Sequence, residues 1–180
     1  MRKILFASAI SLLMVSCNSK DEKKEEEKKE DVISSKDADM KALYEKNLAT
    51  LKAFIADFEK EDSNGMASRV ADSAIWHSPA YGDSDSTKAH WMGSLKSYLA
   101  NWSNLHLTDG NFLPGIDGTT HELDGSVRYY GRWDGIHSSG VATKLKFYGT
   151  YDFNKDNKII RANDFFDLGG MMNAIKPAAK

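Results

Sequence analysis

The spacing of the apolar residues changes partway along this chain, from the period of a helix to the alternation of a strand. Over residues 39–60 apolar side chains recur three and four positions apart, which predicts an amphipathic helix with Asp37 or Asp39 as its N-cap. Residues 126–137 and 141–153 instead alternate, and they are rich in aromatic and β-branched residues. Helices that precede strands in this order predict an α+β fold.

The remaining elements are shorter, and each is bounded by turn or capping residues. We expect helices over residues 66–71, 87–102 and 168–175, and strands over residues 73–77, 105–113 and 158–166. Ser63-Asn64-Gly65 is expected to break the first helix, Asp124-Gly125 to form a turn, and Ser86 and Asp167 to cap later helices.

The N-terminus, residues 1–16, has the pattern of a signal peptide. Arg2 and Lys3 precede an apolar run that is too short to span a bilayer. Met14-Val15-Ser16-Cys17 resembles a bacterial lipobox, and Cys17 is the single cysteine of the chain. The resemblance implies cleavage before Cys17 and acylation of its sulfur. The alternative is an ordinary secretory signal followed by an incidental cysteine.

Residues 17–36 predict a charged, disordered tether. Every residue from 20 to 31 is charged, with seven acidic and five basic side chains, so this segment cannot bury a core. Pairs of opposite charge four residues apart leave partial helix as an alternative. The segment also resembles the export signal of surface lipoproteins in Bacteroidetes-type bacteria. We therefore expect lipid anchoring at the outer membrane, with the domain facing either the periplasm or the cell surface.

Two short segments of the domain, residues 37–176, resemble the SnoaL-like branch of the nuclear transport factor 2-like superfamily. They are Ala71-Asp72-Ser73-Ala74-Ile75-Trp76 and Lys158-Ile159-Ile160-Arg161-Ala162-Asn163-Asp164-Phe165-Phe166-Asp167-Leu168. The resemblance implies a cone-shaped fold with three N-terminal helices packed on a curved antiparallel sheet. It also implies a pocket inside the cone and a homodimer formed by the outer face of the sheet.

Asp164 is the first candidate for chemistry, because alternation places it on the same face as Ala162 and Phe166. A carboxylate among apolar neighbours loses hydration, which raises its pKa and suits it to general acid/base work. The alternative is a structural role, in which Asp164 caps a backbone group or pairs with Arg132.

Arg132 and Asp134, taken with Asp164, are similar to the Arg-x-Asp plus Asp set of limonene epoxide hydrolase-type members. The water-holding Tyr-x-Asn of that group is absent from residues 75–79. The alternative is an exposed pair, either across strands or at a dimer interface. His77, at the end of the first strand, is a candidate base or ligand contact, or else a loop cap.

The aromatic residues predict a binding site for a flat apolar molecule, with plain core packing as the alternative. The expected ligand contacts are Trp76, Tyr81, Trp91, Trp133, Tyr148 and Phe166. No two histidines stand at ligand spacing, and Asp152-x-Asn154-x-Asp156 lacks the glycine and the final acid of a calcium loop, so we expect no metal and no cofactor. A net charge of −2 without a basic cluster argues against nucleic acid as a partner.

Two functions follow from these residues. The first is an envelope lipoprotein whose SnoaL-like domain binds a small apolar or aromatic molecule. The alternative is a cofactor-independent enzyme, an isomerase, cyclase or hydrolase of the epoxide hydrolase type, that uses Asp164 as general acid/base.

Replacing the lipidation site tests the anchor. The Cys17→Ala variant is expected to be soluble or unprocessed, because acyl chains supply roughly 0.8 kcal/mol of membrane affinity per buried methylene. Fractionation of cells into membrane and soluble parts measures the change. A Cys17→Ala protein that still sediments with the membranes would contradict the assignment.

Overall fold

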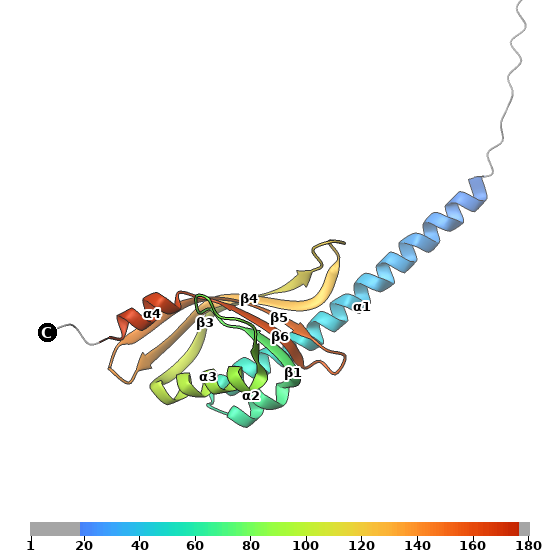
Figure 1. The fold of residues 1–180 in the computed structure, drawn as a ribbon. Coiled ribbons are helices and arrows are strands. Elements are labelled where there is room, and N and C mark those ends of the chain that lie inside the picture. Colours follow the sequence, from blue (N-terminus) through green and yellow to red (C-terminus); the bar gives the residue numbers. More distant parts are fainter. Residues whose placement is uncertain (1–18, 177–180) are drawn as a thin grey trace, which may run out of the picture. The chain divides into compact units, whose positions relative to one another are not determined.

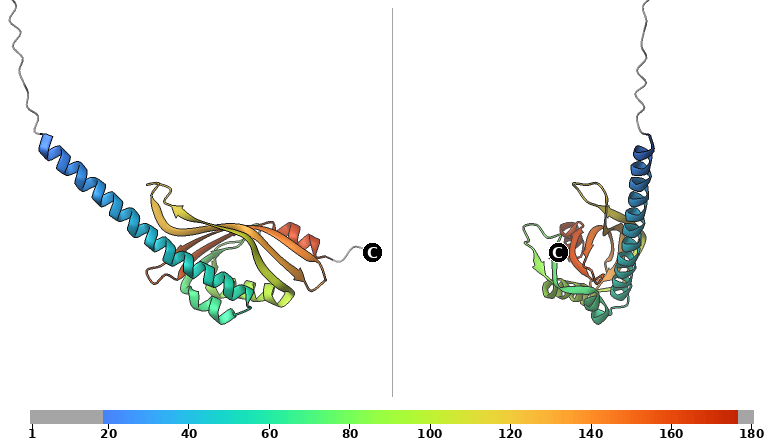
Figure 2. Two further views of the ribbon diagram at one scale, coloured as in Figure 1. Left: turned by 180° about the vertical axis from the view of Figure 1, so that it is seen from behind. Right: turned by 90° about the vertical axis from the view of Figure 1, so that its right-hand side faces the viewer.

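A computed structural model describes the backbone of residues 19–176 and the side chains of residues 37–176. The folded unit begins at Asp37. Figures 1 and 2 show helices packed against one curved sheet. No helix in the described part of the chain is long and apolar enough to cross a membrane. Cys17 and the predicted signal peptide lie outside the described residues.

Helix α1 runs from Ser19 to Glu59, so it begins much earlier than expected. The predicted N-caps, Asp37 and Asp39, lie inside this helix and cap nothing. The preceding segment is rich in Glu and Lys, which are strong helix formers, and it contains no residue that would end a helix. The helical alternative therefore holds for the backbone from Ser19 onward, while the role of residues 17–36 as a tether stays a prediction.

Helix α2 (Ser63–Arg69) comes after α1 and a sharp turn at Glu61, whose φ is 60°. The side chain of Asp62 caps α2 by accepting a hydrogen bond of 2.8 Å from the backbone N–H of Gly65. Ser63-Asn64-Gly65 thus forms the first turn of α2, and the helix break that we expected there lies at Glu61 instead.

The sheet has six strands in the order β2-β1-β6-β5-β4-β3. Their bounds are β1 (Val70–His77), β2 (Ser86–Thr87), β3 (Trp102–Ile116), β4 (Leu123–His137), β5 (Ala142–Phe153) and β6 (Ile159–Phe165). Strands β3 to β6 form a meander joined by tight turns and are therefore antiparallel. Strands β1 and β6 are parallel, which corrects the expected all-antiparallel sheet. Strand β1 can pair in this direction because a helix lies between it and the meander in the chain.

Two local predictions about β4 and the third helix are corrected. Gly125, with a φ of 77°, lies inside β4 opposite a register shift in β3, so Asp124-Gly125 is an irregularity within the strand and not a turn. Helix α3 (Lys88–Asn101) is capped by Thr87 and not by Ser86. The predicted cap of the closing helix α4 (Leu168–Ala174) is confirmed, because the Asp167 carboxylate accepts from the backbone N–H of Gly170 at 2.7 Å.

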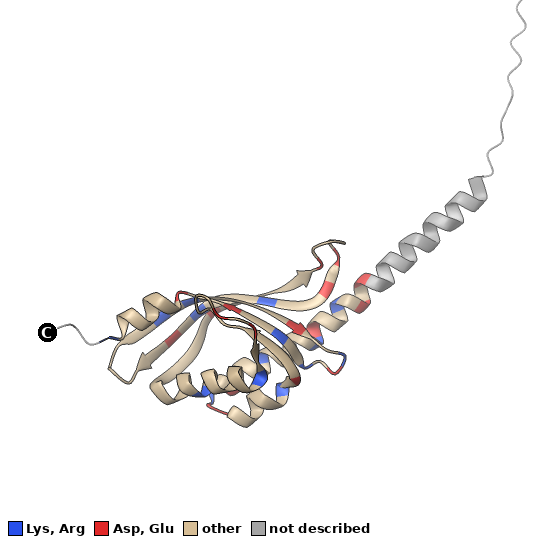
Figure 3. Cartoon of the chain, viewed as in Figure 1, with Lys and Arg blue, Asp and Glu red and all other residues tan. Residues whose placement is uncertain are grey.

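The core lies between the curved sheet and helices α1 and α3. Its fully buried residues include Leu51 of α1, Trp91 of α3, Val127 of β4 and Ile159 of β6. Asn47 is a buried polar residue of α1, and its side chain donates to the Gly125 carbonyl and accepts from Asn157, at 2.8 and 2.7 Å. Charged residues of both signs are dispersed along the described elements (Figure 3).

Candidate functional site

A cavity of about 100 Å³ lies in the core on the concave side of the sheet. Eleven aromatic side chains from α1, α3 and the sheet line it: Phe54, Phe58, Trp76, Trp91, Tyr98, Trp102, Tyr129, Trp133, Phe147, Tyr151 and Phe166. Asp164 is the one lining side chain that carries a charge near neutral pH, and no Lys, Arg or His of the described residues lines the cavity. The site is therefore an aromatic chamber with a single carboxyl group.

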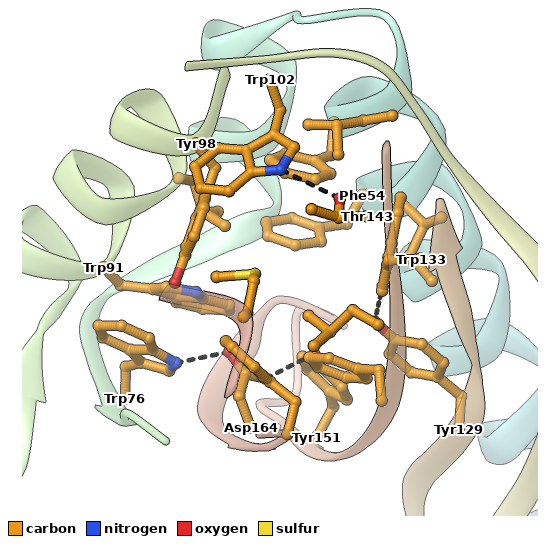
Figure 4. Close-up of a pocket in the computed structure, with 18 residues that line it drawn as sticks. Phe54, Trp76, Trp91, Tyr98, Trp102, Tyr129, Trp133, Thr143, Tyr151 and Asp164 are labelled. Atoms are coloured by element: carbon orange, nitrogen blue, oxygen red, sulfur yellow. Dashed lines mark hydrogen bonds between the residues drawn. The ribbon is translucent and has the colours of Figure 1, made fainter. Parts of the chain in front are cut away.

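Asp164 is held by two neutral donors that reach it from either side (Figure 4). The Trp76 indole N–H donates to Oδ2 at 2.7 Å, and the Tyr151 hydroxyl donates to Oδ1 at 3.0 Å. Trp76 lies on β1 and Tyr151 on β5, the two strands that flank β6. The partners that the structural alternative named for Asp164 are therefore wrong, because neither Arg132 nor a backbone group binds this carboxylate.

Burial raises the pKa of Asp164 to about 6, against the opposing effect of the hydrogen bonds from Trp76 and Tyr151. The residue is 8% exposed. Burial, together with the negative charge of Asp164, also raises the pKa of Tyr98 and of Tyr151. Near neutral pH Asp164 is therefore mostly ionised, while these two phenols stay protonated.

Other rings build the chamber wall in stacks. Tyr129 lies parallel to Phe147, with ring centroids 5.0 Å apart, and Phe147 continues the stack to Phe166 at 5.8 Å. On the helix side, Trp91 packs against Phe54 at 5.3 Å and against Trp76 at 6.4 Å. These flat surfaces face the space around Asp164, which suits a flat or compact apolar guest.

A second hollow, of about 370 Å³, borders the first one. Both are lined by Trp76, Tyr98 and Trp102, and the second also by polar residues such as Ser97 and Asn101. The Tyr98 hydroxyl makes no hydrogen bond to any described residue, whereas the Trp102 indole donates to Thr143 at 3.1 Å. Tyr98 is therefore held by fewer hydrogen bonds than Trp76 and Trp102, the two tryptophans that line both spaces.

The predicted catalytic residues do not converge. Asp164 lines the chamber, but Arg132 and Asp134 pair with each other on the outer face of β4, with Nε–Oδ1 at 2.7 Å. This pair lies within one strand and is partly buried, so it is not the exposed cross-strand pair of the alternative, and its place at a dimer interface stays a prediction. The Arg132 guanidinium lowers the pKa of Asp134 to about 2. His77 also lies outside the chamber, with Asp85 at 2.7 Å from Nδ1. The epoxide hydrolase-like set is therefore not assembled.

Of the six predicted ligand contacts, Trp76, Trp91, Trp133 and Phe166 line the chamber. Tyr81 is fully exposed on the loop before β2, and Tyr148 lies on the outer face of β5 against Phe165, so their expected place at the pocket is corrected.

Sequence reasoning missed Tyr98 and Tyr151 as site residues. Tyr98 stands seven residues after Trp91 and so shares its helix face. Tyr151 stands four residues after Phe147 and so shares its face of β5. The sequence spacing therefore contained a signal for each of the two tyrosines. No group of three or more His, Cys, Asp or Glu in the described residues could hold a metal ion.

The raised pKa of Asp164 makes folding stability depend on pH. Because the folded pKa of about 6 exceeds the unfolded value of 3.8, the folded state holds this proton more tightly. The unfolding free energy of the wild type, taken relative to Asp164→Asn, is expected to fall by about 2 kcal/mol between about pH 4 and pH 7. Urea unfolding of both proteins across that range measures it, and a difference that does not change with pH would contradict the buried carboxyl.

No family model matches the sequence, and no curated protein matches it either. Solved structures do match. A provisionally assigned isomerase from Bacillus subtilis is 18% identical, with a TM-score of 0.61 over 73% of this chain and 94% of that one. A protein of unknown function from Burkholderia pseudomallei, described as nuclear transport factor 2-like, is 17% identical, with a TM-score of 0.60 over 73% and 98%.

A third structure, from Catenulispora acidiphila, is described as having a ketosteroid isomerase-like fold and was solved in complex with trimethylamine. It is 14% identical, with a TM-score of 0.56 over 69% of this chain and 90% of that one. Further matches are provisionally assigned polyketide cyclases, one of them SnoaL-like. Likeness at these identities shows the fold. The folded unit of this chain is an α+β domain of the nuclear transport factor 2-like fold.

Proposed function

We propose that the domain binds a small, largely apolar molecule in the aromatic chamber, with Asp164 as a polar anchor. The observation that carries the proposal is a buried carboxylate in the cavity wall whose partners, Trp76 and Tyr151, are both neutral. Each carboxylate oxygen accepts one hydrogen bond from the protein and has a further lone pair to offer. A guest that donates a hydrogen bond to Asp164 and packs its apolar part against the rings matches both the carboxylate and the aromatic wall.

The size of the chamber limits the guest. A cavity of about 150 Å³ lined by apolar side chains holds benzene, so a chamber of about 100 Å³ takes a molecule of about four non-hydrogen atoms. A longer molecule would have to displace Tyr98 and extend into the outer hollow. The trimethylamine complex of the Catenulispora acidiphila protein supports the proposal, because it shows a small molecule held by a protein of this fold.

Filling the chamber tests this function. The full chain, extracted from the membranes of its native host, is expected to carry a non-covalently bound small molecule that native mass spectrometry detects. The Leu95→Trp variant should lack it, because an indole at this chamber-lining position occupies much of the space. A Lys96→Trp variant, changed at the next position along α3, serves as the control and should keep the molecule. Equal occupancy in the wild type and Leu95→Trp would contradict binding in the chamber.

A second candidate is a cofactor-independent enzyme in which Asp164 transfers a proton. It is favoured by the pKa of Asp164, about 6, because acid/base catalysis is most efficient when the catalytic pKa lies near the working pH. Related folds that are provisionally assigned as isomerases and cyclases add support. This candidate needs Asp164 alone, since Arg132, Asp134 and His77 lie outside the chamber.

Removing the charge separates the two functions. If the bound molecule is a substrate, Asp164→Asn should abolish its turnover and keep its affinity within about tenfold, because one hydrogen bond contributes about 1 kcal/mol. Asp134→Asn, on the outer face of the sheet, is the matched control and should keep full turnover. Turnover in Asp164→Asn equal to that of the wild type would rule out the proton-transfer role.

We also propose that lipid on Cys17 anchors the protein at the outer membrane, with the domain facing the periplasm or the cell surface. The proposal is supported by the apolar run before Cys17 and the charged segment after it. A homodimer through the outer face of the sheet stays a prediction of the family resemblance. The exposed side chains of Tyr130, Tyr148 and Phe165, which lie in register across β4, β5 and β6, would belong to such an interface.

A further inference from the structure

Trp91 has a buried indole N–H that donates to nothing. Among the buried side-chain nitrogen and oxygen atoms of residues 37–176, Trp91 Nε1 alone lacks a hydrogen-bond partner. The three other tryptophans, Trp76, Trp102 and Trp133, donate to Asp164, Thr143 and Tyr129 respectively. A buried donor without an acceptor is costly and rare in folded proteins, so the unpaired N–H calls for a partner.

The unpaired donor belongs to the same chamber as Asp164. Trp91 is 1% exposed, and it lines the cavity together with Asp164. In Figure 4 its indole extends from α3 toward the middle of the chamber. Its ring stacks on Trp76, whose own N–H is taken by Asp164. Apart from the Tyr98 hydroxyl at the border with the outer hollow, the chamber thus presents one unused donor and one carboxylate with unused acceptor capacity, and both belong to buried side chains.

We infer that Trp91 Nε1 is a second polar anchor and that the guest is a small neutral molecule with a hydroxyl group. This inference rests on the proposed binding function. The hydroxyl oxygen accepts a hydrogen bond from the Trp91 indole N–H, and the hydroxyl O–H donates a hydrogen bond to Asp164. The rest of the guest is apolar and lies against the aromatic wall.

Other polar groups meet only part of this demand. A carbonyl oxygen accepts a hydrogen bond from Trp91 but offers Asp164 no hydrogen-bond donor. An ammonium group donates to Asp164 but leaves Trp91 unpaired. A carboxylate adds a second negative charge beside Asp164 in a cavity whose lining residues include no cation to offset it. A hydroxyl group is both donor and acceptor, which makes an alcohol, a phenol or an enol the class that fits.

Three probes of nearly equal size test the class: propan-2-ol, acetone and isopropylammonium, each of about four non-hydrogen atoms to match the chamber. They are titrated into the full chain in detergent, and the indole N–H signals of the four tryptophans are followed by NMR after ¹⁵N labelling. Trp91→Phe assigns the signal of Trp91. Tyr148→Phe, on the outer face of the sheet, is the control variant.

We expect propan-2-ol to bind about tenfold more tightly than the other two probes and to shift the Trp91 signal downfield as a hydrogen bond forms. Trp91→Phe should weaken propan-2-ol binding about tenfold and leave isopropylammonium binding unchanged. Tyr148→Phe should bind every probe like the wild type.

Three results would overturn the inference, and they differ in what survives. If isopropylammonium or acetone binds more tightly than propan-2-ol, the hydroxyl class is wrong while the binding function stands. If propan-2-ol binds but the Trp91 signal does not move and Trp91→Phe binds equally well, the anchor role of Trp91 is wrong. If no probe binds and none of the four indole signals moves, the proposed binding function fails as well.

Discussion

The hydrogen bond from the Trp76 indole to Asp164 joins the first long strand of the sheet to the last, 88 residues apart. It exists because β1 and β6 are parallel neighbours, with Trp76 beside Ala162 and Asp164 one step further along the same face. Tyr151 closes the arrangement from β5. A buried carboxylate is stable only when donors reach it, so these two hydrogen bonds favour the register in which the three strands meet. The chamber wall is built around that requirement.

Two aspartates on the same sheet show how position sets chemistry. Asp134 faces outward beside Arg132, and its pKa falls to about 2, so it behaves as half of a surface ion pair. Asp164 faces inward with neutral partners, and burial raises its pKa to about 6. Both residues follow an arginine at a short spacing in the sequence. The two aspartates differ in the face of the sheet on which they lie. Asp134 on the outer face forms an ion pair, and Asp164 on the inner face can hold or release a proton near neutral pH.

Much of the fold could be predicted from the chain, because alternation and helical spacing are local signals. On β4, alternation separates Tyr129 and Trp133 from Arg132, but it was the structure that placed the two aromatic residues inside and the predicted catalytic Arg132 outside. The capping role of Asp167 was likewise a local matter. Helix and strand ends were less accurate, because the sequence before Asp37 has no helix-ending residue and the irregular backbone at Gly125 depends on its pairing with β3. The parallel pairing of β1 and β6 has no local signal.

By itself the sequence determined an α+β order of elements, an apolar setting for Asp164 and a set of aromatic residues sufficient for a chamber. Which of those rings surround one cavity was decided only by the tertiary structure, which turned Tyr148 outward and brought Tyr98 and Tyr151 in. It also decided that the partners of Asp164 are Trp76 and Tyr151 rather than Arg132, and that the indole N–H of Trp91 has none. The physical reason is that the face of a residue follows from local period, whereas its hydrogen-bond partner depends on strand register and helix packing between segments far apart in the chain.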